Sequence, residues 1–180
     1  LHHALCRIIT PLFDKAFIYD SYASRKGKGV HRAVERLQSV AWRLSRNNTS
    51  TVWALKCDIK KFFASVDHER LLSFCADRIN DNRVRALCAE IISSFEENTG
   101  KGVPLGNLTS QLFANVYLDR LDQYVKRTLR IKNYLRYTDD FVLLSHDRSE
   151  LERVLPLINA FLLQDLDLDL HPTKVFFRKW

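Results

Sequence analysis

Two adjacent aspartates, Asp139 and Asp140, lie inside an apolar segment that runs from Tyr134 to Leu144. Ionised carboxylates resist leaving water, and like charges side by side repel, so such a pair lowers stability unless something compensates. Divalent cations are the natural partner, because they bind oxygen ligands. A plain hairpin turn is the alternative, but the common hairpin turns place glycine after aspartate, and Phe141 follows here. The pair therefore predicts a metal site at the bend of a β-hairpin.

A third carboxylate, Asp58, ends an apolar segment that predicts a strand over residues 51–59. Alone, Asp58 would be interpreted as a turn or helix-cap aspartate. With Asp139 and Asp140 it predicts an acid cluster at neighbouring strand ends, able to hold two Mg²⁺ or Mn²⁺ ions about 3.5–4 Å apart. Two such ions activate an attacking hydroxyl and neutralise the leaving oxygen, which is the chemistry of nucleotidyl transfer.

The elements that position these acids follow from the spacing of apolar residues, which predicts an α+β fold with helices packed on one face of an antiparallel sheet. Asp67 and Asn107 are expected helix caps, and Pro11 and Pro156 are expected to interrupt hydrogen bonding within their helices. Residues 165–170 alternate between aspartate and leucine, which predicts a half-exposed strand with its leucines inward. We expect helices over residues 2–18, 68–79, 82–95, 108–129 and 149–164, and another that begins at Val30. The remaining strands are a hairpin over residues 134–144 and a returning strand that begins at Val175.

The composition is that of a folded protein rather than a disordered or membrane-spanning one. The chain has 180 residues, 46% of them hydrophobic, and no apolar run of membrane-spanning length. Its four cysteines show no Cys-x-x-Cys spacing, so we expect reduced, mostly buried thiols and a cytoplasmic location. The absence of methionine predicts that the sequence is a piece of a longer chain.

Positive charge is unevenly spread along the chain, whose formal net charge is +7. Residues 24–46 hold seven Lys or Arg against one acid, and residues 126–136 hold five with none. The arginines of the helix from Val30 recur at helical spacing and therefore share one face. Such a face indicates a polyanionic partner, nucleic acid first, with a solvated surface as the alternative. The arginines concerned are Arg32, Arg36, Arg43 and Arg46.

Five segments together resemble the reverse transcriptase family, in the family's order. Residues 137–140 match its Tyr-x-Asp-Asp motif, and residues 55–67 resemble the strand that carries its first catalytic aspartate. Residues 102–111 resemble the loop and helix start beneath the nucleotide, 168–174 the later palm motif with its lysine, and 21–29 the fingers motif of bacterial enzymes. The resemblance implies an RNA-directed DNA polymerase with a right-hand palm and a partial, helical fingers region.

The resemblance also implies a role for each matching residue. Asp58, Asp139 and Asp140 would be the catalytic acids, with the Ile59 carbonyl helping to bind the metals. Phe63 would be an aromatic gate against the ribose 2′-hydroxyl, which implies preference for deoxynucleotides. The other implied nucleotide contacts are Lys61, Phe62, Leu105, Gly106, Gln111 and Lys174. The implied nucleic-acid contacts are Arg25, Lys26, Lys28, Arg32, Arg36, Arg43 and Tyr137.

Simpler interpretations stand beside some of these roles. Phe63 could instead be a core phenylalanine, an interpretation that suits Phe62 even better. Lys174 could instead be an exposed lysine in a turn. The partners that the resemblance implies are an RNA template, a DNA or RNA primer and deoxynucleoside triphosphates. It also leaves room for an accessory protein, and it implies no membrane.

Two positions depart from the family's commonest pattern. Leu105 stands where many members have glutamine, and Ser110-Gln111 stands where many have Ser-Pro. The second departure resembles the enzymes of diversity-generating retroelements, which copy an RNA with errors at adenines. Group II intron-like and retron-type enzymes remain alternatives, as does a nucleic-acid-binding module without catalysis.

The resemblance divides the chain, taken as one reverse transcriptase domain, into regions. Residues 1–50 would be partial fingers, 51–74 palm, 75–100 helices between fingers and palm, and 101–180 palm. The thumb is expected to be absent from this chain, and to follow residue 180 in a longer protein.

Overall fold

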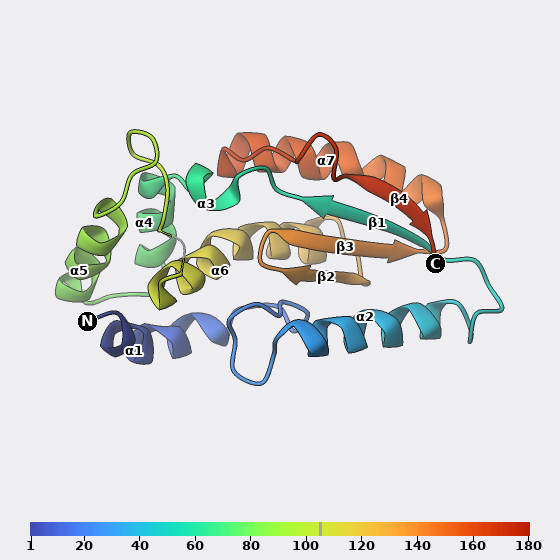
Figure 1. The fold of residues 1–180 in the computed structure, drawn as a ribbon, viewed down its shortest axis with the longest axis horizontal. Coiled ribbons are helices and arrows are strands. Elements are labelled where there is room, and N and C mark those ends of the chain that lie inside the picture. Colours follow the sequence, from blue (N-terminus) through green and yellow to red (C-terminus); the bar gives the residue numbers. More distant parts are fainter. Residues whose placement is uncertain (105) are drawn as a thin grey trace.

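A four-stranded antiparallel sheet lies at the centre of the computed structural model, which describes residues 1–104 and 106–180. The strand order is β2-β3-β1-β4, so the strand that ends at Asp58 lies between two others (Figure 1). β2 and β3 form the expected hairpin, with Thr138 and Asp139 at its turn. The strands are β1 (Trp53–Asp58), β2 (Tyr134–Tyr137), β3 (Asp140–Ser145) and β4 (Phe176–Lys179).

The main core lies between one face of this sheet and the helix α6. Leu55 and Cys57 on β1 and Phe141 and Leu143 on β3 point into it and are at most 1% exposed. α6 is buried on most sides because α1, α4 and α7 all pack against it. The arrangement confirms the predicted α+β class. The helices are α1 (His2–Asp14), α2 (Val30–Leu44), α3 (Phe62–Ser65), α4 (His68–Ala76), α5 (Asn82–Ser93), α6 (Leu108–Gln123) and α7 (Arg148–Leu166).

α2 covers part of the opposite face of the sheet, and Figure 1 shows the sheet between α2 and α7. The C-terminal half of α2 forms a second, smaller core with strand residues that alternate along the sheet with those facing the main core. Val30 and Val34, near its start, are 50% and 47% exposed, so only half of its apolar stripe is covered. The buried members of this second core are Val40, Ala41, Val52 and Leu144.

The predicted strand over residues 165–170 is wrong. α7 continues to Leu166, and Asp167 then adopts a left-handed conformation with φ 51°. The leucines still point inward, because Leu166 closes the last helical turn and Leu168 packs as the chain leaves it. Only Leu170 pairs with the sheet region, in a single bridge to Ile59, so β4 returns alongside β1 instead of forming a hairpin.

Several helix boundaries also differ from the sequence-based expectation. α1 ends at Asp14, before the expected residue 18, and α6 gives way to a π-helical turn, η1 (Tyr124–Thr128). Asp67 caps α4 as predicted, since its Oδ1 accepts a hydrogen bond from the Arg70 amide at 2.8 Å. Asn107 occupies the capping position of α6 without a side-chain hydrogen bond.

All four cysteines are buried and unpaired, as predicted. Burial raises the pKa of Cys57 to about 12, so this thiol stays protonated at neutral pH. Within the described residues, no helix combines the length and the apolar character needed to cross a membrane.

Candidate active site

The pairing of β1 with β3 places Asp58 directly opposite Asp140 at one end of the sheet. Asp139, in the hairpin turn, lies beside them, because its carbonyl accepts a hydrogen bond from the Ile59 amide at 3.3 Å. Antiparallel neighbours have their Cα atoms about 4.5–5.5 Å apart. The fold therefore brings together three acids that the sequence separates into two distant segments.

Two lysines form ion pairs with acids of this cluster, one with Asp58 and one with Asp140. Lys174 Nζ lies 3.1 Å from Oδ2 of Asp58 and donates a hydrogen bond to it. Lys56 Nζ lies 2.9 Å from Oδ1 of Asp140, outside hydrogen-bond geometry, so this buried oxygen has no aligned donor among the described residues. Lys174 is a residue that the sequence singled out. Lys56 was missed, although its position two residues before Asp58 on a strand places both side chains on one face.

Asp139 has no such counter-ion among the described residues. Burial raises its pKa, and the nearby charges of Asp58 and Asp140 raise it further, while Lys174 lowers it. Of the three acids, Asp139 is the one whose negative charge has no counter-ion among the described residues. A bound cation would therefore stabilise its ionised form most.

Arg136 stabilises the turn that carries Asp139 by a hydrogen bond to its backbone. This fully buried guanidinium donates to both carboxylate oxygens of Asp122 on α6, and its Nη1 donates to the Thr138 carbonyl at 2.9 Å. Tyr134 donates its hydroxyl to the same Asp122 at 2.7 Å. Sequence reasoning missed this network, and its signal was an arginine inside the apolar segment 134–144 and an aspartate at a buried position of a helix.

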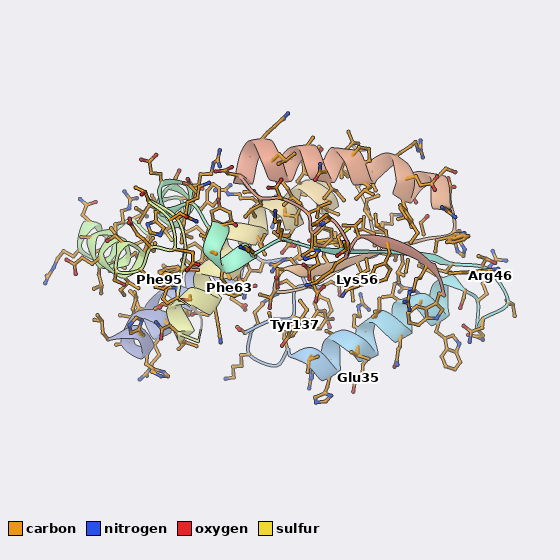
Figure 2. The ribbon with its side chains drawn as sticks, turned by 45° about the horizontal axis from the view of Figure 1, so that its top comes forward. Glu35, Arg46, Lys56, Phe63, Phe95 and Tyr137 are labelled. Atoms are coloured by element: carbon orange, nitrogen blue, oxygen red, sulfur yellow. The ribbon has the colours of Figure 1, made fainter. Side chains whose placement is uncertain are left out.

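The loop at Gly102 and Val103 packs against α3, the short helix that follows β1. The Val103 amide donates to the Phe63 carbonyl, and the Gly102 amide to that of Val66, both at 2.8 Å. Phe63 is half-buried on α3, whereas Phe62 is 1% exposed in the core and leaves Phe63 as the accessible ring (Figure 2). The loop that resembles a nucleotide-site segment is thus held directly against Phe63.

The remaining predicted nucleotide contacts occupy varied surroundings. Lys61 is exposed, with a left-handed φ of 46° at the start of α3. Gly106 has φ 91° and open space where a side chain would begin, and Leu105 lies outside the described residues. Gln111 is exposed, and its Oε1 accepts a hydrogen bond from the Ser24 hydroxyl at 2.9 Å.

Three of the seven predicted nucleic-acid contacts already have partners within the chain. Arg25 is bound to Asp14 at 2.6 Å and to the carbonyls of Ile18 and Ser21. Lys28 lies 3.6 Å from the centre of the Tyr19 ring, and Arg36 pairs with Asp20 at 2.9 Å. These three basic side chains stabilise the segment 14–36, so a phosphate would have to compete for them. Their intramolecular partners follow from tertiary contacts that residue spacing does not show.

The other predicted contacts are accessible. Lys26, Arg32 and Arg43 are exposed and form no ion pair with any described residue. Tyr137 is 40% exposed beside the acid cluster. Arg46 lies beyond the end of α2 with φ 49°, so it does not continue the basic face of that helix.

The acid cluster suits divalent cations in its donor chemistry. Carboxylate and carbonyl oxygens are the ligands of Mg²⁺ and Mn²⁺, and Asp140 Oδ1 is buried without a hydrogen-bond donor. In the described part of the chain, however, no three His, Cys, Asp or Glu side chains converge as a ready metal-binding group. Asp58 and Asp140 instead contact lysines, so cation binding would require these side chains to turn.

Comparison with known proteins places the chain in a family. Residues 1–179 match the family model for reverse transcriptase (RNA-dependent DNA polymerase). The chain is 25% identical over 162 residues to the group II intron-encoded protein LtrA of Lactococcus lactis subsp. cremoris, which covers 87% of this chain and 24% of that protein. It is 27% identical over 132 residues to protein YkfC of Escherichia coli K12, covering 69% of this chain and 34% of that protein.

A third relative is an uncharacterized 91 kDa protein in the cob intron of Schizosaccharomyces pombe. It is 29% identical over 125 residues, which cover 66% of this chain and 14% of that protein. The match thus spans between 14% and 34% of the length of these three relatives.

Solved structures of telomerase share the fold. Apo telomerase from Candida tropicalis, truncated from the C-terminal domain, superposes with a TM-score of 0.74 at 14% identity, over 99% of this chain and 40% of that one. The telomerase of the same organism in complex with a TWJ fragment of telomeric RNA gives 0.72 at 15% identity, over 98% and 33%. At these identities the likeness extends to the fold alone.

Proposed function

Because the chain belongs to the reverse transcriptase family, we propose that it forms the catalytic palm of an RNA-directed DNA polymerase, which adds deoxynucleotides to a primer on an RNA template. The observation that carries this proposal is the register of β1 against β3, which sets Asp58 opposite Asp140 with the Asp139 turn beside them. Three acids on adjacent strand ends are the arrangement that two-cation nucleotidyl transfer needs.

Each residue of the site would then have a defined task. Asp58, Asp139, Asp140 and the Ile59 carbonyl would hold the cations, Mg²⁺ or Mn²⁺. When bound, such ions activate the primer hydroxyl and neutralise the leaving pyrophosphate. Phe63 would meet the sugar of the incoming nucleotide, and Lys174 would balance charge on its phosphates.

The surrounding residues would bind the substrates less specifically. Lys61, Leu105, Gly106 and Gln111 would line the nucleotide site, with Phe62 supporting Phe63 from the core. Lys26, Arg32 and Arg43 would contact phosphates of the template and primer, which gives salt-sensitive binding without sequence preference. The basic residues already paired within the chain, Arg25, Lys28 and Arg36, would mainly shape this surface.

The division into partial fingers (1–50), palm (51–74 and 101–180) and connecting helices (75–100) is part of the same proposal. It is supported by the sheet, which draws all its strands from the two palm ranges. We also propose a cytoplasmic enzyme of a bacterial retroelement. Intron-encoded relatives support a group II intron origin, and the Ser110-Gln111 ending supports a diversity-generating element.

Primer extension tests the proposal directly. A protein containing this chain is incubated with an RNA template, an annealed primer, deoxynucleotides and Mg²⁺. We expect extension by the wild type and none by Asp139→Asn, which keeps the size of the side chain but removes its charge. Lys179→Gln, on the edge strand β4 and without an ion pair among the described residues, is the control and should extend normally. Extension by Asp139→Asn at the wild-type rate would refute the assignment.

A further inference from the structure

Lys56 is the basic residue of the acid cluster to which no role has yet been assigned. β1 places it on the same face as Asp58, because Cys57 between them points into the core. Its partner in the register is Val142, and its ammonium reaches diagonally to Asp140 at 2.9 Å. Both side chains remain more than a third exposed, so this ion pair is accessible to solvent.

The two lysines approach the acids from different directions. Lys174 comes from the loop before β4 and pairs with Asp58, whereas Lys56 pairs with Asp140 from within β1. Asp139 has no lysine among the described residues. The carboxylates of Asp58 and Asp140 thus each have a lysine counter-ion in the structure.

The position of Lys56 along β1 decides what it faces when substrates are bound. Phe63 and the loop at Gly102, which is hydrogen-bonded to it, lie beyond the C-terminal end of β1. Under the proposed function the incoming nucleotide would lie on that side of Asp58. Lys56 lies on the other side, about 6.6 Å back along the strand, and Figure 2 shows it well apart from Phe63. In an in-line transfer the attacking hydroxyl lies opposite the leaving group. The 3′ end of the primer would therefore lie on the Lys56 side.

We propose that Lys56 is a primer-positioning residue, whose ammonium pairs with Asp140 in the cation-free site and binds a phosphodiester of the primer strand once cations hold the carboxylates. This inference rests on the proposed polymerase function. A cation that binds Asp140 removes the charge that held Lys56, and the primer supplies another anion on the same side of the site. Lys56 and Asp140 thus exchange partners when the site is loaded.

Cation binding without nucleic acid is the first test. Free Mn²⁺ is measured by its paramagnetic resonance signal as the chain is titrated, for the wild type, Lys56→Gln and Lys179→Gln. Removing a positive charge beside Asp140 should tighten Mn²⁺ binding by about fivefold, the size of a partly exposed ion pair. Lys179→Gln should bind as the wild type does, and Asp139→Asn should lose the site.

Primer binding is the second test. The affinity of a labelled DNA primer that lacks its 3′-hydroxyl, annealed to RNA, is measured at several salt concentrations, in EDTA and in saturating Mg²⁺. In Mg²⁺, Lys56→Gln should bind more weakly and lower the salt slope by about 1, the loss of one phosphate contact. In EDTA its slope should equal that of the wild type, because Lys56 is then engaged by Asp140.

The outcomes separate this inference from the proposed function. Mn²⁺ binding that depends on Asp139, together with a salt slope that Lys56→Gln leaves unchanged in Mg²⁺, would overturn the role of Lys56 and keep the polymerase site. A slope lowered equally in EDTA and in Mg²⁺ would also overturn it, since Lys56 would then contact phosphate without exchanging partners. Absence of any Asp139-dependent cation binding would overturn both proposals.

Discussion

Arg136 and Asp122 form a bidentate ion pair with neither side chain exposed, at 2.8 Å from Nε to Oδ1 and 2.7 Å from Nη2 to Oδ2. The pair joins β2 to α6 next to the turn that carries Asp139. Burial lowers the pKa of Arg136, but Asp122 raises it by more, so the guanidinium stays charged. Because its third nitrogen donates to the Thr138 carbonyl, the pair links the buried interior to the turn that carries Asp139.

Asp122→Asn should lower the free energy of unfolding by about 3–5 kcal/mol, because it leaves a buried guanidinium without its counter-charge. Urea unfolding followed by circular dichroism measures this loss. The matched control is Asp77→Asn, which removes an exposed pair with Arg120 and should cost less than about 1 kcal/mol. Equal losses in the two variants would show that the buried pair contributes no more than a surface one.

Asp139→Asn should make the cation-free chain slightly more stable at neutral pH. The pKa of Asp139 is raised in the folded state, so its ionisation costs more there than in the unfolded chain. Below its ordinary pKa, Asp139 is protonated in both states and the penalty vanishes; the penalty grows as pH rises from the ordinary pKa to the raised folded-state pKa, and it is constant above that. We expect a gain of less than about 1 kcal/mol near pH 7 that disappears at acid pH, measured by urea unfolding in EDTA.

A residue with the opposite shift provides the control for that experiment. Asp147 caps α7, and the hydrogen bond from the Ser149 side chain, followed by that from its amide, lowers the Asp147 pKa. Its ionised form stabilises the fold above the ordinary aspartate pKa, and this stability is lost as pH falls through the lowered value. Asp147→Asn should therefore destabilise at neutral pH. A loss of stability in Asp139→Asn under the same conditions would contradict the electrostatic account of the acid cluster.

That the three acids lie together could be predicted from the sequence, starting from Asp139 and Asp140, which interrupt an apolar hairpin. Asp58, at the end of an apolar strand, is noticeable only once that pair is considered. Lys56 and Asp122 gave weaker signals, because their partners lie far along the chain and follow from strand register and helix packing. The alternation of aspartate and leucine at 165–170 led to the wrong prediction of a strand. It predicts correctly which side chains point inward, but the end of α7 and the irregular segment after it satisfy the same pattern.

Gly102→Ala should destabilise the loop that supports Phe63. Gly102 has φ 108°, and a side chain there would begin 3.0 Å from the Glu97 amide nitrogen. We expect a loss of more than about 2 kcal/mol in urea unfolding, combining backbone strain with this overlap. Gly27→Ala is the control, since Gly27 has φ 72° but open space around it, and only the backbone cost of about 1–2 kcal/mol applies. Equal effects would mean that the contact with Glu97 relaxes freely.

Phe63→Ala should relax discrimination against ribonucleotides if Phe63 is the ring that meets the sugar. The measurement is the ratio of kcat/KM for a deoxynucleotide to that for the matching ribonucleotide, in primer extension on RNA. We expect the ratio to fall by about 10- to 200-fold, as for loss of a steric contact in a substrate pocket. Phe62→Leu is the control: its ring packs 6.4 Å from that of Tyr117 in the core, so stability should fall while the ratio holds. A ratio that changes in Phe62→Leu but not in Phe63→Ala would assign sugar selection to the core packing of α3 rather than to the half-buried ring.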